Sequence, residues 1–481
     1  MNTQTKKAVI IGGGITGLAA AHALQEKARE SGLPLTTTLV ESENRLGGKI
    51  LTDRKDGFVI EGGPDSFISQ KPWGLDLCIR LGLKDHLNGT NREQTATYIL
   101  NHGRLVNLPE GVMLMVPTRF GPFIRTPLFS LSGKIRMGMD LFLPKNTSGE
   151  DESLAGFVER RLGQEAVERL AEPLMAGIYA GDAHQMSLAS TFPQFRDLEN
   201  RYGSLIRGML ARRKEMRNRA SSGKPAPWTM FMTLKNGLSE IVETLAGKLE
   251  PGSVLTGSGA ERIHWKPGLS LYHVRLKNGT VLEAHSVISA APAYVTANLM
   301  AQTDATLVRS LNEIPYVSTA TVSLAFRKKD FSHPLNGFGF VVPRGENRGI
   351  MACTWTSTKF PHRAPDDGIL LRCFVGGAGR EEILSGPDDE ILKRVRTDLK
   401  ETMGISEEPL FSKVYRWERA NPQYLVGHGE RLAEIDDRLS RFPGLFLAGA
   451  AYRGIGIPDC IRQGQNAADQ AHRYLNTPEP S

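Results

Sequence analysis

Three glycines near the amino terminus have the spacing of a nucleotide-binding turn. Gly12, Gly14 and Gly17 form the pattern G-x-G-x-x-G. The first glycine allows a tight turn, the second lets a pyrophosphate touch the backbone, and the third permits close packing of a helix on a strand. Amide groups at the start of that helix can bind phosphate oxygens. A plain turn is the alternative, but we expect a cofactor diphosphate to contact Gly12, Gly13, Gly14, Ile15, Thr16 and Gly17.

A carboxylate follows the glycine turn at a suitable distance. Glu41 ends a β-branched segment 24 residues after Gly17 and can accept both ribose hydroxyls of an adenosine. The glycine turn and Glu41 are compatible with either NAD or FAD. The next residues, with Arg45, Gly48 and Lys49, extend the pattern to E-x-x-x-R-x-G-G. This extension resembles that of FAD enzymes of the amine-oxidase type, where the arginine and the glycine amides reach the diphosphate and ribityl chain. The resemblance favours FAD over NAD.

A second glycine-rich loop precedes the last helix expected from the sequence, at about 458–475. Pro458 suits a first helical turn, where its missing N–H costs nothing. The positive end of this helix can face the pyrimidine edge of a flavin, which carries negative charge when reduced. An ordinary capped helix is the alternative. The expected flavin contacts here are Ile455, Gly456, Ile457 and Pro458.

These motifs require a βαβ unit to position them. Residues 6–11 and 36–40 have the composition of buried strands, and the segment between them is typical of a helix to about residue 29. Residues 445–449 form another expected strand before the last helix. Helical spacing dominates 154–174 and 388–403, and Asn278-Gly279 between alternating segments predicts a hairpin. The chain therefore carries strand, glycine loop and helix at both ends.

Composition excludes several classes of protein. The chain has 481 residues, 40% apolar and 23% charged, which is ordinary for a folded protein of two to four domains and excludes disorder and collagen. Its formal charge is +7, and the densest basic run is Arg212-Arg213-Lys214 with Arg217 and Arg219 nearby. A solvated helix face explains this run better than a nucleic-acid site, so we expect no nucleic-acid partner. Acidic small molecules or an anionic membrane surface would suit the same charge balance.

Cysteine and histidine spacing predicts neither a metal site nor a redox pair. Cys78, Cys353, Cys373 and Cys460 form no C-x-x-C, and the eleven histidines form no H-E-x-x-H.

The sequence shows no secretory leader and no apolar run of about 18 residues. We expect a cytoplasmic protein with reduced thiols. Because residues 105–215 mix Met, Phe, Leu and Arg, peripheral membrane contact there is the further expectation.

Taken together, these motifs resemble those of the bacterial porphyrinogen oxidases of haem synthesis, in particular the soluble Gram-positive type that forms coproporphyrin III. The resemblance covers nearly the whole chain. Its most particular stretches are 172–182 and Cys353-Thr-Trp-Thr with Pro361-His362. It also rests on the two glycine regions described above, on 63–67 and 190–195, and on 454–460.

The resemblance implies further site residues. Additional FAD contacts would be Gly63, Pro64, Asp65, Ser66, Val254 and Trp417, with the Val254 backbone against the adenine. The substrate would lie near Lys71, Ile178 and Tyr179. Lys71 can bind a propionate, with a solvated loop lysine as the alternative; Tyr179 can stack on a pyrrole or belong to the core.

The resemblance also implies the fold. We expect an α/β protein with a doubly wound, Rossmann-like FAD-binding domain, an α+β substrate-binding domain and a helical inserted domain. The FAD-binding domain would comprise 1–75, 225–298 and 420–481. The substrate-binding domain would comprise 76–110 and 299–419, and the helical domain 111–224.

The implied reaction is oxidation of coproporphyrinogen III to coproporphyrin III by three two-electron steps. A bridging methylene gives a hydride to flavin N5, a pyrrole nitrogen loses its proton, and dioxygen reoxidises the flavin with release of hydrogen peroxide. Because the oxidation is strongly downhill, no catalytic residue is required and we name none.

Protoporphyrinogen IX, which has two vinyl groups in place of two propionates, is the alternative substrate. A flavin amine oxidase, a carotenoid desaturase or a non-enzymatic porphyrin or flavin carrier are further alternatives. The oligomeric state stays open.

Overall fold

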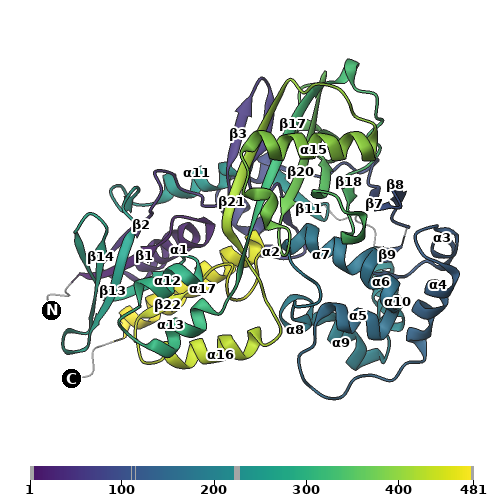
Figure 1. The fold of residues 1–481 in the computed structure, drawn as a ribbon. Coiled ribbons are helices and arrows are strands. Elements are labelled where there is room, and N and C mark those ends of the chain that lie inside the picture. Colours follow the sequence, from purple (N-terminus) through teal and green to yellow (C-terminus); the bar gives the residue numbers. More distant parts are fainter. Residues whose placement is uncertain (1–4, 110, 114, 221–227, 478–481) are drawn as a thin grey trace.

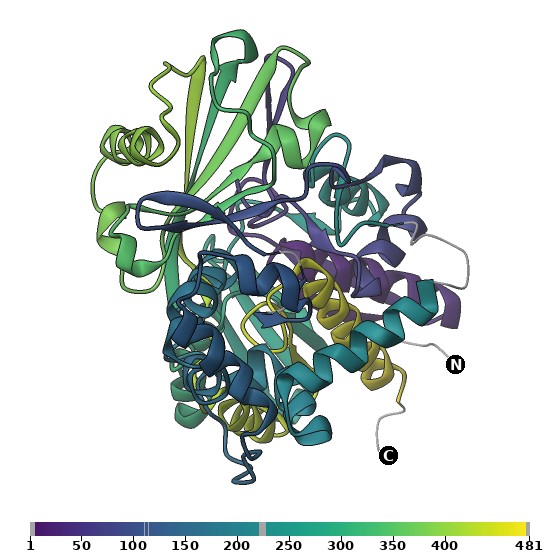
Figure 2. The same ribbon diagram turned by 90° about the vertical axis from the view of Figure 1, so that its right-hand side faces the viewer.

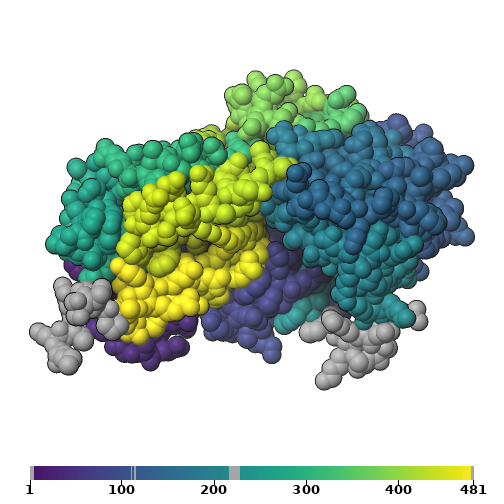
Figure 3. All heavy atoms as spheres, turned by 90° about the horizontal axis from the view of Figure 1, so that it is seen from below, coloured from purple at the N-terminus to yellow at the C-terminus, as the bar shows by residue number. Residues whose placement is uncertain are grey.

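The computed structural model describes residues 5–109, 111–113, 115–220 and 228–477. Figure 1 shows three regions: a parallel sheet with its helices beside the two termini, a larger sheet at the top, and a group of helices at the right. Seen from below, the carboxy-terminal segment lies on the surface between the α12–α13 side of the molecule and the helical group (Figure 3). The chain crosses between these regions several times.

The first region is built on a five-stranded sheet in which every neighbouring pair is parallel. The sheet has the order β12 (Val254–Leu255), β2 (Leu35–Val40), β1 (Lys6–Ile11), β16 (Ser286–Ser289), β22 (Leu445–Leu447). Helix α1 (Ile15–Ser31) follows β1, and α17 (Ile457–Asn476) follows β22. The strands and helices predicted at both ends of the chain are therefore confirmed.

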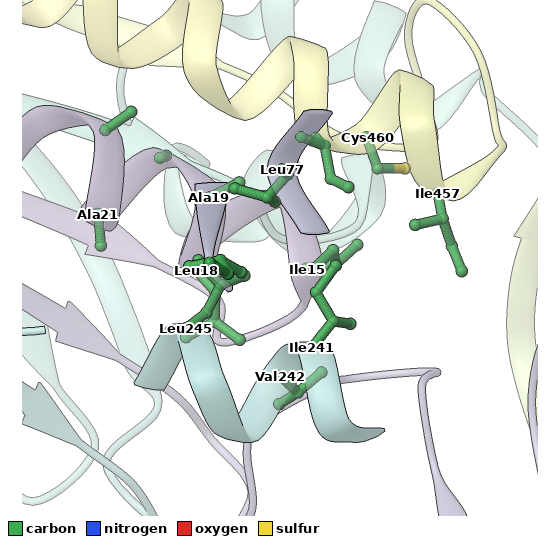
Figure 4. Packing of buried hydrophobic residues seen from close by; sticks show 14 of the residues in the cluster. Ile15, Leu18, Ala19, Ala21, Leu77, Ile241, Val242, Leu245, Ile457 and Cys460 are labelled. Atoms are coloured by element: carbon green, nitrogen blue, oxygen red, sulfur yellow. The ribbon is translucent and has the colours of Figure 1, made fainter. Parts of the chain in front are cut away.

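Alternate residues of β1 enter two different cores, because successive side chains of a strand point to opposite faces. Ala8 and Ile10 belong to the core under α1 and α17, which Figure 4 shows from close by. That face also carries α2 (Pro72–Arg80) and α11 (Ser239–Lys248). Val9 and Ile11 belong to the core on the opposite face. The elements of that face are β13 (Ala260–Lys266), β14 (Leu271–Leu276), β15 (Val281–Ala284), α12 (Ala293–Leu299), α13 (Ala305–Asn312) and α16 (His428–Leu439). Coverage of both faces confirms the doubly wound fold, and β14–β15 is the predicted hairpin.

The second region is a seven-stranded sheet. Its order is β21 (Phe411–Pro422), β17 (Tyr316–Arg327), β20 (Gly368–Gly376), β19 (Ile350–Trp355), β18 (Gly339–Val341), β7 (Thr97–Asn101), β8 (Arg104–Asn107). All pairs are antiparallel except β18 with β7. The predicted helix at 388–403 is α15 (Asp388–Met403), whose buried residues join the core of this sheet. Helix α14 (Thr356–Lys359) follows β19.

The third region is helical and faces the viewer in Figure 2, below the seven-stranded sheet. Its helices are α3 (Phe120–Arg125), α4 (Leu131–Gly138), α5 (Leu154–Leu162), α6 (Gln164–Ala166), α7 (Glu172–Tyr179), α8 (Leu188–Thr191), α9 (Pro193–Tyr202) and α10 (Leu205–Ala220). A π-helical turn at Val167–Ala171 joins α6 to α7. These helices enclose a buried core of their own. No helix in the described part of the chain is long and apolar enough to cross a membrane.

Short strands connect the regions. The hairpin of β3 (Thr52–Lys55) and β4 (Phe58–Glu61) is followed by a small sheet of order β5 (Phe67–Ile68), β11 (Phe231–Leu234), β6 (Leu87–Gly89). A two-stranded ribbon, β9 (Val112–Met113) and β10 (Val116–Pro117), precedes the helical region. Residues 62–66, between β4 and β5, lie against strands β17 and β21 of the seven-stranded sheet.

Candidate cofactor and substrate site

The glycine turn between β1 and α1 is as tight as its sequence requires. Gly12 has a φ of 103°, and a Cβ on Gly17 would come within 1.8 Å of the Gly12 carbonyl oxygen. Gly14 is the N-cap of α1. A Cβ on Gly14 would first meet the Gly48 Cα at 4.0 Å, so the position borders open space. The first amide groups of α1 can therefore be approached closely by an anion such as a diphosphate.

The second glycine pair folds against this turn. The Gly47 amide donates to the Gly13 carbonyl oxygen at 2.8 Å, and Gly14 and Gly47 form a parallel bridge. Arg45 braces the pair, since its guanidinium donates to the Gly48 carbonyl oxygen at 2.6 Å. The structure thus brings the two sequence motifs into one cradle and turns Arg45 onto its own loop.

Glu41 lies buried at the carboxyl end of β2. Its Oε2 accepts from the Gly13 amide at 2.6 Å, and its Oε1 accepts from the Glu43 amide at 2.8 Å. Because a carboxylate has about four acceptor positions, it can still accept a ligand hydroxyl. Val254 lies beside this end of β2, paired with Leu39 in the sheet. The predicted adenosine contacts are therefore neighbours in space.

The start of α17 provides a second set of helix amides near the first. Gly456 is the N-cap, Pro458 stands in the first turn, and Ile455 precedes them in a half-buried loop. Farther along α17, a Cβ on Gly464 would come within 2.3 Å of the Thr16 carbonyl oxygen. Seven residues of helix separate Ile457 from Gly464, or about 10 Å. A ligand whose phosphates bind at the start of α1 could therefore place a ring system about 10 Å away, at the start of α17.

Residues 62–66 are clamped by the seven-stranded sheet. The Gly62 carbonyl oxygen accepts from the Trp417 indole at 2.8 Å and from the Thr321 hydroxyl at 2.7 Å. A Cβ on Gly63 would come within 1.7 Å of the Lys49 carbonyl oxygen, so only glycine fits there. The clamp fixes the predicted contacts Gly63 and Pro64 next to the cradle that contains Lys49.

Asp65 is the buried anion of this segment. Lys359 approaches it at 3.1 Å and Arg372 at 3.9 Å, and Ser66 donates to it at 2.6 Å. Burial alone would raise the pKa of Asp65, but the charges of Lys359 and Arg372 outweigh burial and hold this pKa well below its usual range. Arg372 also donates to the Gly63 carbonyl oxygen. Asp65 is therefore ionised and immobile at neutral pH.

Lys49 is the cation of the cradle, and its side chain as a whole is exposed. Its ammonium donates to the Ala420 carbonyl oxygen, and the protein atoms packed around the ammonium lower its pKa. Cys460, at the start of α17, is close enough for its charge state to act on Lys49, and burial raises the pKa of its thiol to about 11. Lys49 therefore places an ammonium donor in the cradle.

One of the three predicted substrate residues, Lys71, is paired with a buried carboxylate. Lys71 is the N-cap of α2, and its Nζ lies 2.5 Å from Oδ2 of Asp459 in α17. Tyr179 ends α7, and burial, with the charge of Asp459 next, raises the pKa of its phenol to about 12. Ile178 is the exposed neighbour of Tyr179. Lys71 thus joins α2 to the start of α17, whereas the Tyr179 ring packs edge-on against Phe192 in the helical region.

Several residues of this arrangement escaped the sequence reasoning. Asp459 follows Pro458, and an acidic residue in a first helical turn was the signal that could have identified it. Lys359 ends the short helix α14, and Thr321 and Arg372 lie in strands β17 and β20, whose sequences give no such signal. Within the described residues, no group of three or more His, Cys, Asp or Glu side chains could hold a metal ion.

Comparisons of the sequence and the fold with known proteins identify similar flavin-containing enzymes. The sequence profile of the family described as "Flavin containing amine oxidoreductase" matches residues 15–472. The "Coproporphyrinogen III oxidase" of Bacillus subtilis (strain 168) is 42% identical over 476 residues, which cover 99% of this chain and 100% of the relative. The protein of the same name from Staphylococcus aureus is 34% identical and covers 97% of this chain and 99% of its own. A crystal structure from Exiguobacterium sp. 255-15 superposes with a TM-score of 0.86 at 33% identity, covering 98% of this chain and 100% of that one.

Proposed function

The chain belongs to the flavin-containing amine oxidoreductase family, and from that premise we propose that it oxidises coproporphyrinogen III to coproporphyrin III in haem biosynthesis. The observation that carries the proposal is the full-length match, at 42% identity, to a coproporphyrinogen III oxidase. FAD is the cofactor of this chemistry. When bound, it supplies the hydride acceptor, and dioxygen takes up the electrons and leaves as hydrogen peroxide.

The cradle of glycines has the shape and donors that FAD needs. The amides of Gly14 and the first turn of α1 would hold the diphosphate, and Glu41, fixed by the Gly13 amide, would accept a ribose hydroxyl. The open space at Gly14 supports this assignment, because a side chain there would occupy the place of the phosphates. Val254 contacts the adenine through its backbone.

The other end of the cofactor lies at α17 in this proposal. The amides after Gly456 would face the pyrimidine edge of a bound flavin, where their partial positive charge would stabilise negative charge. Segment 63–66 and Trp417 border the ring, held in place by hydrogen bonds from the seven-stranded sheet. Lys49, whose ammonium donates to the Ala420 carbonyl oxygen, is the cation available to the cofactor in this cradle.

The substrate lies between the helical region and the start of α17. Lys71 binds a propionate, exposed Ile178 covers part of the apolar ring, and the Tyr179 phenol borders the site. The assignment is supported by the pairing of Lys71 with Asp459 at the start of α17 and by the exposure of Ile178. No residue of the chain is assigned as a catalytic base.

We keep the division of the chain into an FAD-binding, a substrate-binding and a helical domain as part of this proposal. It is supported by the separate buried cores. Two lie on the faces of the parallel sheet, one lies under the seven-stranded sheet, and one lies among helices α3–α10.

A cytoplasmic location with peripheral membrane contact completes the proposal. All four cysteines are free and buried. Leu131, Ile135, Met139 and Phe142 lie at i, i+4, i+8 and i+11, on one face of α4 and the 3₁₀ turn Met139–Leu141, and all four are exposed. The exposed α3 side chains Phe120 and Ile124 precede them.

The charge around these six side chains, which we call the α3–α4 surface, suits an anionic lipid bilayer. Arg125, Lys134 and Arg136 lie among them, and the one acidic residue of the stretch, Asp140, is buried against Arg161. Sedimentation with phosphatidylglycerol vesicles tests the contact, with phosphatidylcholine vesicles as the control. We expect the L131S/F142S double variant to sediment less with the anionic vesicles; equal recovery with and without vesicles contradicts the membrane contact.

Parallel steady-state rates on coproporphyrinogen III and protoporphyrinogen IX test the substrate. The proposal requires a higher kcat/KM for coproporphyrinogen III, because it carries two more propionates for cationic residues such as Lys71. A preference for protoporphyrinogen IX would favour the alternative oxidase. Oxidation of a polyamine without either porphyrinogen would indicate an amine oxidase, and bound FAD without any turnover would indicate a carrier.

A further inference from the structure

Asp459 lies between two cations at the start of α17. Its Oδ2 is 2.5 Å from the Lys71 ammonium, and its Oδ1 is 3.7 Å from Nη2 of Arg462, one turn along the helix. The Asp459 side chain is 5% exposed, whereas those of Lys71 and Arg462 are 42% and 33% exposed. A buried carboxylate thus holds together two cations that reach solvent.

Arg462 is fixed by contacts other than Asp459. Its guanidinium lies over the Trp73 ring, 4.4 Å from the centroid, and its Nη2 donates to the Arg453 carbonyl oxygen at 3.2 Å. Trp73 belongs to the first turn of α2, two residues after Lys71. Both cations are therefore anchored to α2 and α17 together, and their separation does not depend on long flexible side chains alone.

The charges of this trio do not cancel. Two cations and one carboxylate leave one net positive charge in a partly exposed place. An ammonium has three N–H donors and a guanidinium has five, so donors remain for a second carboxylate. Such a group would meet two charged donors at once, which is the stronger form of carboxylate binding.

We propose that Asp459 is a positioning residue that holds Lys71 beside Arg462, so that the two cations together bind one carboxylate of the substrate. The inference deepens the function proposed above and rests on it. Lys71, a predicted substrate residue, is a member of the trio and relates it to the substrate region. A tetracarboxylate such as coproporphyrinogen III gives the extra cation a partner.

Steady-state kinetics of four variants test this inference. D459N removes the bridging charge, K71M and R462Q remove one cation each, and R473Q neutralises an exposed arginine in the last turn of α17 as the control. We expect KM for coproporphyrinogen III to rise about tenfold in D459N, K71M and R462Q, because each loses a charge-assisted hydrogen bond or its orientation. We expect kcat and FAD content to stay within about twofold, and R473Q to match the wild type.

A double-mutant cycle separates positioning from a structural role. If Asp459 acts through Lys71, then K71M/D459N has nearly the same KM as K71M. D459E retains the charge and should restore most of the affinity lost in D459N. Independent, multiplying effects of K71M and D459N would overturn the positioning role, and an R462Q variant with wild-type KM would overturn the second cation.

Binding of the product gives a readout that needs no turnover. Titration of coproporphyrin III into each holoenzyme should show the same order of affinities, with weaker dependence on salt in K71M and R462Q. Unchanged affinity in all variants would contradict the inference. If the wild type oxidises coproporphyrinogen III while every variant keeps its KM, this inference alone fails; if the wild type does not oxidise it, the proposed function fails.

Discussion

Gly464 of α17 lies against Thr16 of α1, so close that a Cβ on Gly464 would come within 2.3 Å of the Thr16 carbonyl oxygen. The two residues are 448 positions apart in the sequence. Figure 4 shows Ile15 of α1 near Ile457 and Cys460 of α17. The absence of a side chain at Gly464 lets the two helices approach, so that their amino-terminal ends can belong to one cofactor site.

Replacing Gly464 with alanine should therefore separate the helix starts. The added methyl group meets backbone, which cannot rotate away, and overpacking of this kind costs about 1–3 kcal/mol. We expect G464A to lower the free energy of unfolding by that amount and to lower FAD content as well. G429A is the matched control, because no described atom lies within 4 Å of a Cβ on Gly429 in α16. If G464A matches G429A in both measurements, the close contact is not required.

The open space at Gly14 predicts a different outcome. A valine there is tolerated by neighbouring protein atoms, since the nearest one is 4.0 Å from the new Cβ, but it projects into the proposed place of the diphosphate. We expect G14V to fold and to purify without FAD, measured as the ratio of flavin to protein absorbance. G247V adds the same side chain to an exposed helical glycine and should retain the cofactor. Full FAD occupancy in G14V would contradict the site.

His428, which packs beside the loop before α17, should make the free energy of unfolding depend on pH. Its ring stacks on Tyr424 at 4.1 Å, and the Tyr424 hydroxyl accepts from the Gly454 amide. Burial, together with the charges of Arg431 and Arg453, lowers the pKa of His428 to about 4. The unfolded chain therefore takes up a proton below pH 6.5 that the folded protein resists until about pH 4.

The stabilising effect of neutral His428 is thus present above pH 6.5 and is lost as the pH falls toward 4. The pKa shift corresponds to about 3 kcal/mol of unfolding free energy. H428Q keeps a side-chain donor for the Tyr452 carbonyl oxygen but does not titrate. Urea unfolding at pH 7 and pH 4.5 should show a smaller pH dependence in H428Q than in the wild type. Parallel losses in both proteins would contradict the assignment to His428.

The elements at both ends of the chain could be predicted because their signals are local. Residues 6–11 and 36–40, the glycine turn and the last helix each have a composition that favours one structure over a few residues. The resulting β1, α1, β2 and α17 agree with the prediction to within a few residues. The hairpin at Asn278-Gly279 is local in the same sense, since its turn specifies the pairing of β14 with β15.

The partners of the site residues could not be predicted, because they are contacts between distant segments. Asp65 meets Lys359 across 294 positions, and Lys71 meets Asp459 across 388. Nothing in the neighbourhood of Lys71 in the sequence distinguishes a paired lysine from a solvated one. The arrangement follows from the packing of α2 on α17, and only the fold shows that packing.

Anaerobic mixing of the purified, yellow protein with coproporphyrinogen III tests the central claim most directly. The account predicts that the flavin absorbance bleaches as coproporphyrin III absorbance rises, and that admitting dioxygen restores the flavin with release of hydrogen peroxide. Protein that binds FAD whose absorbance never bleaches with coproporphyrinogen III, or protein that takes up no flavin when FAD is supplied, would contradict it.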